Sequence, residues 1–148
     1  MKNLLFVLVL LMSFSCGEKS KESTETKEED DVEWKEMDDF HAVMADVYHP
    51  LKDSNNLEPI RKDADNLAAA ATKWRQAELP AKVDNAETKD LLSKLEDGTK
   101  DLAQAVKDGS SDDIIAAKLN ILHDTFHSIM ESWYKAGKEE GAEEHHDH

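Results

Sequence analysis

Apolar residues recur every three or four positions near the C-terminal end of the chain, and this spacing constrains the fold more than any other feature. They are Ile115, Leu119, Leu122, Phe126, Ile129 and Trp133. Residues at these intervals fall on one side of an α-helix, and a continuous seam of them is typical of helices packed in a bundle. No segment of the sequence shows the alternation of apolar and polar residues that marks a half-buried strand. The sequence therefore predicts a helical protein.

Two helices are predicted in the first half of the folded part. The first covers about 33–48 and ends before His49 and Pro50, because proline lacks an N–H donor and disfavours continuation of a helix. We interpret His49 as a helix-end residue that interacts with the helix dipole. The second covers about 57–77, with one of the asparagines just before it as its cap and Pro59 in its first turn.

Two more helices follow. One opens after Asn85 and stops at Gly109, and the helix that carries the apolar seam begins at Ser110 or Ser111. Four helices joined by short loops predict an all-α fold, an up-down-up-down antiparallel four-helix bundle over residues 32–136. In this arrangement the first and fourth helices are antiparallel neighbours.

The N-terminus predicts export and membrane attachment. Residues 1–15 have the anatomy of a secretory signal peptide, with a basic start at Lys2 and an apolar run over 4–12. That run is shorter than the roughly 20 residues that a membrane-spanning helix needs. The only cysteine, Cys16, stands where such a signal is cut, and this segment resembles the lipobox of bacterial lipoproteins. The resemblance implies that Cys16 is lipidated and anchors the protein in the cell envelope, in the outer membrane facing the periplasm or the cell surface.

Polar segments flank the predicted bundle. After its cysteine, the segment 16–31 has no aromatic or aliphatic side chain, so burial cannot offset the entropy of ordering it, and we predict a disordered acidic tether. Residues 137–148 form an acidic, histidine-rich tail. The net charge of −15 repels phosphate backbones, which excludes nucleic acid as a partner.

A seven-residue motif occurs twice. Residues 38–44 and 124–130 both read D-x-F-H-[AS]-[VI]-M, and a tyrosine follows each methionine by four positions, at Tyr48 and Tyr134. Because the helices that carry the two copies are expected to be antiparallel neighbours, a local two-fold axis can relate the copies. The repeat then brings imidazole and thioether groups together in one place.

The repeat predicts a metal site. One helical face in each copy carries side chains at intervals of four and three residues: Met37, His41, Met44 and Tyr48 in the first, and His123, His127, Met130 and Tyr134 in the second. The six side chains other than the two tyrosines are predicted metal ligands. This set suits copper, above all Cu(I), and zinc is the alternative if carboxylates take part. Asp38 and Asp124 are predicted either as further ligands or as acceptors that orient the imidazoles.

The second half of the bundle also resembles a family of haem proteins. Residues 79–133 are similar to the second half of soluble cytochrome b562 and its cytochrome c′ relatives. The shared features are a proline-containing middle loop, a leucine-bearing third helix, a glycine-marked turn and a histidine after an aromatic residue, here His127 after Phe126. The resemblance implies a non-covalent haem b between His127 and either His41 or Met37, in an electron-transfer protein.

Three functions are therefore open. The first is a lipid-anchored envelope protein that binds copper or zinc, the second is the haem b electron carrier, and the third is a structural or interaction lipoprotein in which the repeat only packs. No nucleophile or acid–base pair stands apart from the predicted ligands, so we predict no enzymatic activity. The expected partners are the membrane, through Cys16, and a redox or metal-transfer protein.

Overall fold

The computed structural model describes residues 33–143, with side chains described through residue 138. This part of the chain contains four α-helices and a short 3₁₀-helix. In chain order they are α1 (Lys35–Ser54), α2 (Glu58–Gln76), η1 (Ala81–Val83), α3 (Ala86–Lys107) and α4 (Asp112–Glu143). Within 33–143 there is no β-strand, so the all-α prediction is confirmed.

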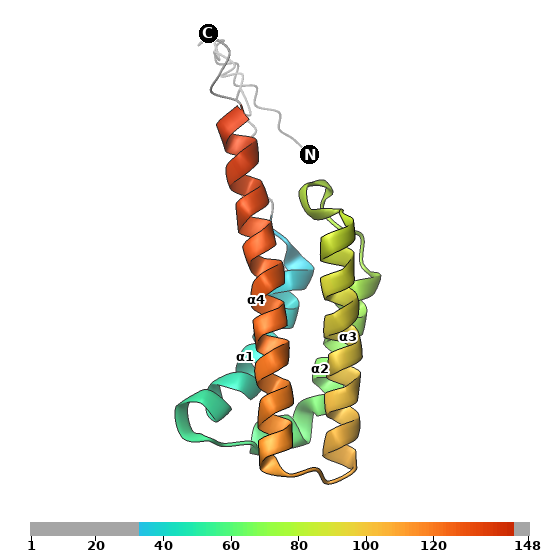
Figure 1. Cartoon of the computed structure of the whole chain (residues 1–148), viewed down its shortest axis with the longest axis vertical. Helices are drawn as coiled ribbons and strands as arrows, with labels where there is room; N and C mark the ends of the chain where they lie inside the picture. The colour runs from blue at the N-terminus through green and yellow to red at the C-terminus, as the bar shows by residue number, and fades with distance from the viewer. Residues whose placement is uncertain (1–32, 144–148) are drawn as a thin grey trace, which may run out of the picture. The chain divides into compact units, whose positions relative to one another are not determined.

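The helices form the predicted up-down-up-down bundle (Figure 1). Each helix packs against its neighbours in sequence, and α1 also packs against α4, which closes the four-helix bundle. The α1–α4 interface is the least extensive of the four. α4 extends well past the ends of the other helices in Figure 1 and reaches Glu143, so it continues beyond residue 136, where the sequence placed the end of the bundle.

Every helix turns one apolar face to the interior. In α4 the whole predicted seam from Ile115 to Trp133 is buried. The buried positions of the other helices follow the same steps of three and four residues. Among them are Met37, Phe40, Met44, Val47 and Leu51 in α1, Ile60, Ala64, Leu67, Ala71 and Trp74 in α2, and Thr88, Leu92, Leu95, Thr99 and Leu102 in α3. Removal of these faces from water is the main force that holds the bundle together.

The first helix is longer than predicted. The expected end at residue 48 is wrong, because α1 continues through Pro50 to Ser54. A proline inside a helix removes a backbone hydrogen bond and costs about 3 kcal/mol in a helix interior. Pro50 gives up one such bond, and the helical path buries Leu51, the next residue, in the core. Asn55, in the left-handed conformation, ends the helix.

Polar and glycine residues mark the limits of α3, at Asn85 and Gly109, as the sequence predicts. The Asn85 side chain accepts a hydrogen bond of 2.9 Å from a backbone N–H in the first turn of α3. The predicted asparagine cap of α2 is wrong, because Leu57 is the N-cap residue and makes no side-chain cap. Asn56, one residue earlier, accepts a hydrogen bond of 3.0 Å from the N–H of Glu58, and Pro59 occupies the first turn as predicted. After α3, Gly109 adopts a φ of +69°, a left-handed conformation that glycine takes without strain.

An aromatic cluster fills the interior near the start of α1. Trp34, just before α1, makes an edge-on contact with Trp74 at 5.2 Å between ring centroids and lies 5.4 Å from Trp133. Phe40 and Phe126 extend the cluster at 5.3 and 6.1 Å from Trp74. All five rings are buried. Such contacts contribute about 0.5–1.5 kcal/mol per pair beyond the area they bury, so the cluster is a main source of stability.

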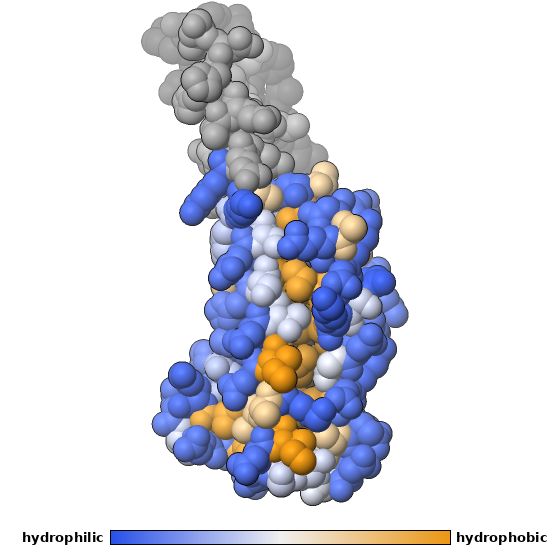
Figure 2. All heavy atoms as spheres, in the orientation of Figure 1, coloured by the Kyte–Doolittle hydropathy of each residue, from blue (hydrophilic) through white to orange (hydrophobic). Residues whose placement is uncertain are grey.

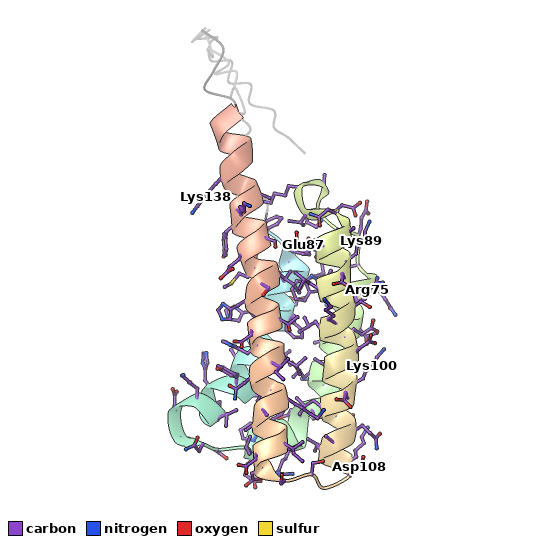
Figure 3. The ribbon with its side chains drawn as sticks, viewed as in Figure 1. Arg75, Glu87, Lys89, Lys100, Asp108 and Lys138 are labelled. Atoms are coloured by element: carbon purple, nitrogen blue, oxygen red, sulfur yellow. The ribbon has the colours of Figure 1, made fainter. Side chains whose placement is uncertain are left out.

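Charged side chains cover the outside of the bundle. The labelled side chains of Lys100 and Asp108 point outward from α3 (Figure 3). On the face seen in Figure 2, apolar side chains gather along the middle, between charged margins. The apolar side chains that α4 exposes include Ile114 and Ile121. Within the described helices, none combines the length and hydropathy that a bilayer crossing requires.

The predictions for the two ends of the chain concern residues outside the described part. These are the signal peptide over 1–15, the lipidated Cys16 with its tether over 16–31, and the end of the tail over 144–148. They stay predictions from the sequence.

Candidate metal centre

The two copies of the repeated motif meet at their phenylalanines. Phe40 of α1 and Phe126 of α4 lie with ring centroids 5.7 Å apart and ring planes at 42°. These residues occupy equivalent positions in the motif, so the antiparallel packing of α1 and α4 brings the copies face to face. Both rings are buried, whereas the histidine that follows each of them, His41 or His127, lies nearer the surface.

Two imidazoles face each other on α4. The Nε2 atoms of His123 and His127 are 3.1 Å apart, and the ring centroids are 4.4 Å apart. A four-residue spacing places both side chains on one side of the helix, one turn from each other. Both are half-buried at the margin of the core. For two neutral rings this contact is a hydrogen bond in which one Nε2 donates and the other accepts.

The same separation fits two nitrogens bound to one metal ion. With metal–nitrogen bonds of about 2.0–2.1 Å and a tetrahedral angle, two ligand nitrogens lie about 3.3 Å apart. The observed 3.1 Å is therefore within a small side-chain adjustment of a chelate. Histidines four residues apart on a helix also bind zinc in the H-E-x-x-H metalloprotease motif. The segment H-D-T-F-H from His123 to His127 has the same histidine spacing without that glutamate.

Two further side chains surround His123. The ring of Tyr48, from α1, stacks on the imidazole with centroids 3.7 Å apart and planes at 9°. The Oδ1 atom of Asp124 lies 3.9 Å from Nδ1 of His123, which is longer than a hydrogen bond. A carboxylate on this side favours the tautomer that carries its proton on Nδ1, and this tautomer leaves the Nε2 lone pair free. Asp124 thus lies where it can orient the His123 ring.

Burial also disfavours the charged form of His123. It lowers the pKa of the imidazole below the ordinary value of 6.5, and repulsion from His127 lowers the pKa further. The Asp124 carboxylate opposes this shift in part. The neutral ring is the form that binds metal, so His123 stays able to bind at a pH where an exposed histidine begins to take up a proton.

The histidine of the first copy lies in different surroundings. His41 is exposed, and its ring lies over Phe126 at a centroid distance of 5.0 Å and an angle of 28°. His127 is half-buried and meets Phe126 edge-on at 5.8 Å and 70°. Both motif histidines therefore contact one phenylalanine at the α1–α4 interface. Their joint use in one ligand set stays a prediction.

The predicted methionine ligands differ in accessibility. Met37 and Met44 are 4% and 1% exposed, and their thioethers are part of the core. Met130 is half-buried and packs against the core three residues after His127. Asp38, the carboxylate of the first copy, is exposed. Met130 is thus the methionine most accessible to a metal ion beside the histidine pair.

The histidine pair supplies two ligands. Within 33–138, no three His, Cys, Asp or Glu side chains gather closely enough to hold a metal ion between them. A metal ion on His123 and His127 therefore completes its coordination with a thioether, water or a group from another molecule. Such a site keeps coordination positions of the metal open for ligand exchange.

A groove of about 350 Å³ lies between α1 and α2. Phe40, Val43 and Trp74 are among its apolar lining residues, and the ion pair between Lys73 and Asp39, at 2.9 Å, borders it. None of the predicted metal ligands lines it. The groove is therefore separate from the histidine pair of α4.

Tyr48 lies beside the histidine pair, but the sequence analysis did not assign it to the site. The available signal was its place in the repeat, four residues after Met44. Its counterpart Tyr134 has the same place in the second copy and is 57% exposed. The two tyrosines have the same place in the repeat, and the contact of Tyr48 with His123 depends on how two helices pack.

Comparison with known protein families, with characterised proteins and with solved structures finds no significant match. The resemblances to the lipobox and to the second half of cytochrome b562 therefore stay predictions, and the candidate site rests on the geometry of α1 and α4.

Proposed function

We propose that this chain is a lipid-anchored protein of the bacterial cell envelope that binds a transition-metal ion, with copper ahead of zinc, and catalyses no reaction. The site lies between α1 and α4, and its centre is the pair formed by His123 and His127. The 3.1 Å separation of their Nε2 atoms carries the proposal. Two imidazoles held at this distance chelate an ion with little rearrangement, which lowers the entropic cost of binding.

The ligand chemistry supports copper as the first choice. Imidazole suits several divalent metals, and affinity for the first-row ions rises to a maximum at Cu(II). A thioether next to the pair favours Cu(I), and Met130 offers one at the same margin of the core. His41, Met37 and Met44 complete the proposed ligand set. Because the two methionines are buried in the core, α1 has to move before either can reach an ion on the histidine pair.

Membrane attachment in this proposal rests on the sequence of residues 1–16. An exchangeable metal on an anchored protein also implies a partner that gives or takes the ion, or exchanges electrons with it. The open coordination positions of the histidine pair suit such transfer.

Haem b is the second candidate, supported by the aromatic interior beside His127. An axial haem site needs a flat apolar slot between its two ligands. Phe126 lies against both His41 and His127, and together with Phe40 and Trp74 it fills the adjoining interior. A macrocycle has to displace these rings, so haem is less favoured than a single ion. A packing role for the repeat is the third candidate.

The test uses the full chain in detergent micelles, with other metal-binding groups removed. Cys16→Ser removes the thiol, and His145→Gln, His146→Gln and His148→Gln remove the imidazoles of the tail. This form, called the parent variant below, keeps every residue of the bundle.

Metal content is measured after equilibration with Cu(I), Cu(II) or Zn(II), and a visible spectrum is recorded after exposure to haem. We expect stoichiometric copper in the parent variant and its loss in His123→Ala/His127→Ala. Equal metal content in both chains rejects the proposed site. A Soret band that disappears with His127→Ala establishes the haem alternative, and a chain that binds neither ligand establishes packing.

A further inference from the structure

We infer that Tyr48 is a positioning residue of this site, and that its ring holds the His123 imidazole in the orientation from which Nε2 faces His127. This inference rests on the proposed function. It gives α1 a role in a chelate whose two histidines both belong to α4.

The geometry of the stack suits this role. The rings of Tyr48 and His123 are close to parallel, at 9°, with centroids 3.7 Å apart. A stacked neighbour covers the face of an imidazole and leaves its edge open. The lone pair that binds a metal lies in the plane of the ring, so stacking and metal binding do not compete for the same atoms. The Nε2 edge remains directed at the second imidazole, 3.1 Å away.

The stack also restricts motion that otherwise opposes binding. A histidine side chain on a helix surface rotates among several conformations, and fixing it on binding costs free energy. The side chain of His123 is 22% exposed, and the Tyr48 ring limits its rotation before the ion arrives. His127 is restricted in turn by its edge-on contact with Phe126. Each imidazole of the pair is therefore held by one aromatic ring.

The repeat supplies a matched control. Tyr134 occupies the place of Tyr48 in the second copy, but the residue of the first copy that corresponds to His123 is Met37. Tyr134 is also 57% exposed. Substitution of Tyr134 therefore removes an equivalent tyrosine without touching the histidine pair.

The experiment compares Tyr48→Phe, Tyr48→Leu and Tyr134→Leu in the parent variant. Cu(II) affinity is measured by competition with a chelator, and the imidazole proton signals of the metal-free chains are compared by NMR. We expect Tyr48→Phe to bind like the parent variant, because it keeps the ring. We expect Tyr48→Leu to bind about tenfold more weakly, because leucine fills the space without a flat face. Tyr134→Leu is expected to match the parent variant.

The NMR signals separate positioning from general damage to the fold. Tyr48→Leu is expected to shift the His123 ring signals, which lie under the tyrosine ring current, while circular dichroism stays that of the parent variant. Equal copper affinity in Tyr48→Leu and the parent variant overturns the inference and leaves the proposed function intact. Weak binding by Tyr48→Phe also overturns it, because the ring is then not the decisive group. A parent variant that binds no copper overturns both.

Discussion

Phe40 and Phe126 occupy the same position in the two copies of the repeated motif, and their buried rings lie 5.7 Å apart across the α1–α4 interface. This interface is the least extensive of the four in the bundle. The pair is one of the ring contacts that join α1 to α4, together with His41 on Phe126 and Tyr48 on His123. It also lies next to His41 and His127, so its packing determines where the histidines of the motif sit.

Substitution of the phenylalanine pair is expected to reveal coupling between α1 and α4. Phe40→Leu and Phe126→Leu are each expected to lower the free energy of unfolding by about 1–2 kcal/mol, because leucine leaves part of the aromatic site empty. In a double-mutant cycle the interaction energy is expected to be about 0.5–1.5 kcal/mol. The interaction energy is measured by urea unfolding that is monitored by circular dichroism. If the two losses in the free energy of unfolding are strictly additive, the two rings do not interact. Tyr134→Leu, at an exposed position, is the control, and its free energy of unfolding is expected to change by no more than about 0.5 kcal/mol.

Metal binding is expected to stabilise the folded chain. At a free ion concentration of about 100 times the dissociation constant, binding to the folded state alone raises the free energy of unfolding by about 2.7 kcal/mol. We expect Cu(II) to produce such a rise in the parent variant and none in His127→Gln. His49→Gln, at an exposed histidine outside the predicted ligand set, is expected to keep the full effect. A rise that survives His127→Gln places the ion elsewhere.

The stability of the metal-free chain is expected to fall on mild acidification through His123. Its folded-state pKa lies below the ordinary value of 6.5, first because of burial and second because of His127. Below that ordinary value the unfolded chain therefore binds more protons, and the free energy of unfolding rises with pH across the window from the folded pKa up to 6.5. Above this window His123 is neutral in both states and contributes nothing to the pH dependence.

The measurement is urea unfolding at about pH 5.5 and about pH 7.5, with a chelator present, for the parent variant and for His123→Phe. Phenylalanine keeps a ring for Tyr48 to stack on and cannot take up a proton. The parent variant is expected to lose more stability between the two pH values than His123→Phe. Carboxylates such as Asp39, whose pKa is lowered chiefly by hydrogen bonds from Lys35 and Lys73, act alike in both chains. Equal losses in the two chains exclude His123 as the source.

Two glycines are expected to respond in opposite directions to alanine. Gly109 has a φ of +69°, where a Cβ atom causes strain, so Gly109→Ala is expected to lower the free energy of unfolding by about 1 kcal/mol. Gly137 lies inside α4, where alanine has the higher helix propensity, so Gly137→Ala is expected to raise it by about 0.5–1 kcal/mol. A new Cβ at residue 137 meets the Nζ atom of Lys82 at 3.3 Å, and a shift of a few tenths of an ångström leaves this atom over the Trp133 ring. Thermal unfolding of the two variants measures both changes in stability. Changes of the same sign contradict the different roles given to Gly109 and Gly137.

The sequence by itself determined the helices and their inward faces. Steps of three and four residues in α4 predicted the whole buried seam from Ile115 to Trp133, because the period of a helix is a local property. Asn85 and Gly109 marked the limits of α3 through hydrogen bonds and backbone angles that involve only nearby residues. The bundle followed from the number of helices and the shortness of the loops.

Only the tertiary structure decided the end of α1 and the surroundings of the histidines. Pro50 opposes a helix locally, yet α1 continues because burial of Leu51 against the other helices adds a favourable term that no local pattern contains. In the same way, Tyr48 and Tyr134 have the same place in the repeat, and the packing of α1 on α4 places the first of them against His123. Contacts between helices depend on the register and rotation of both partners, and these are fixed by the core as a whole.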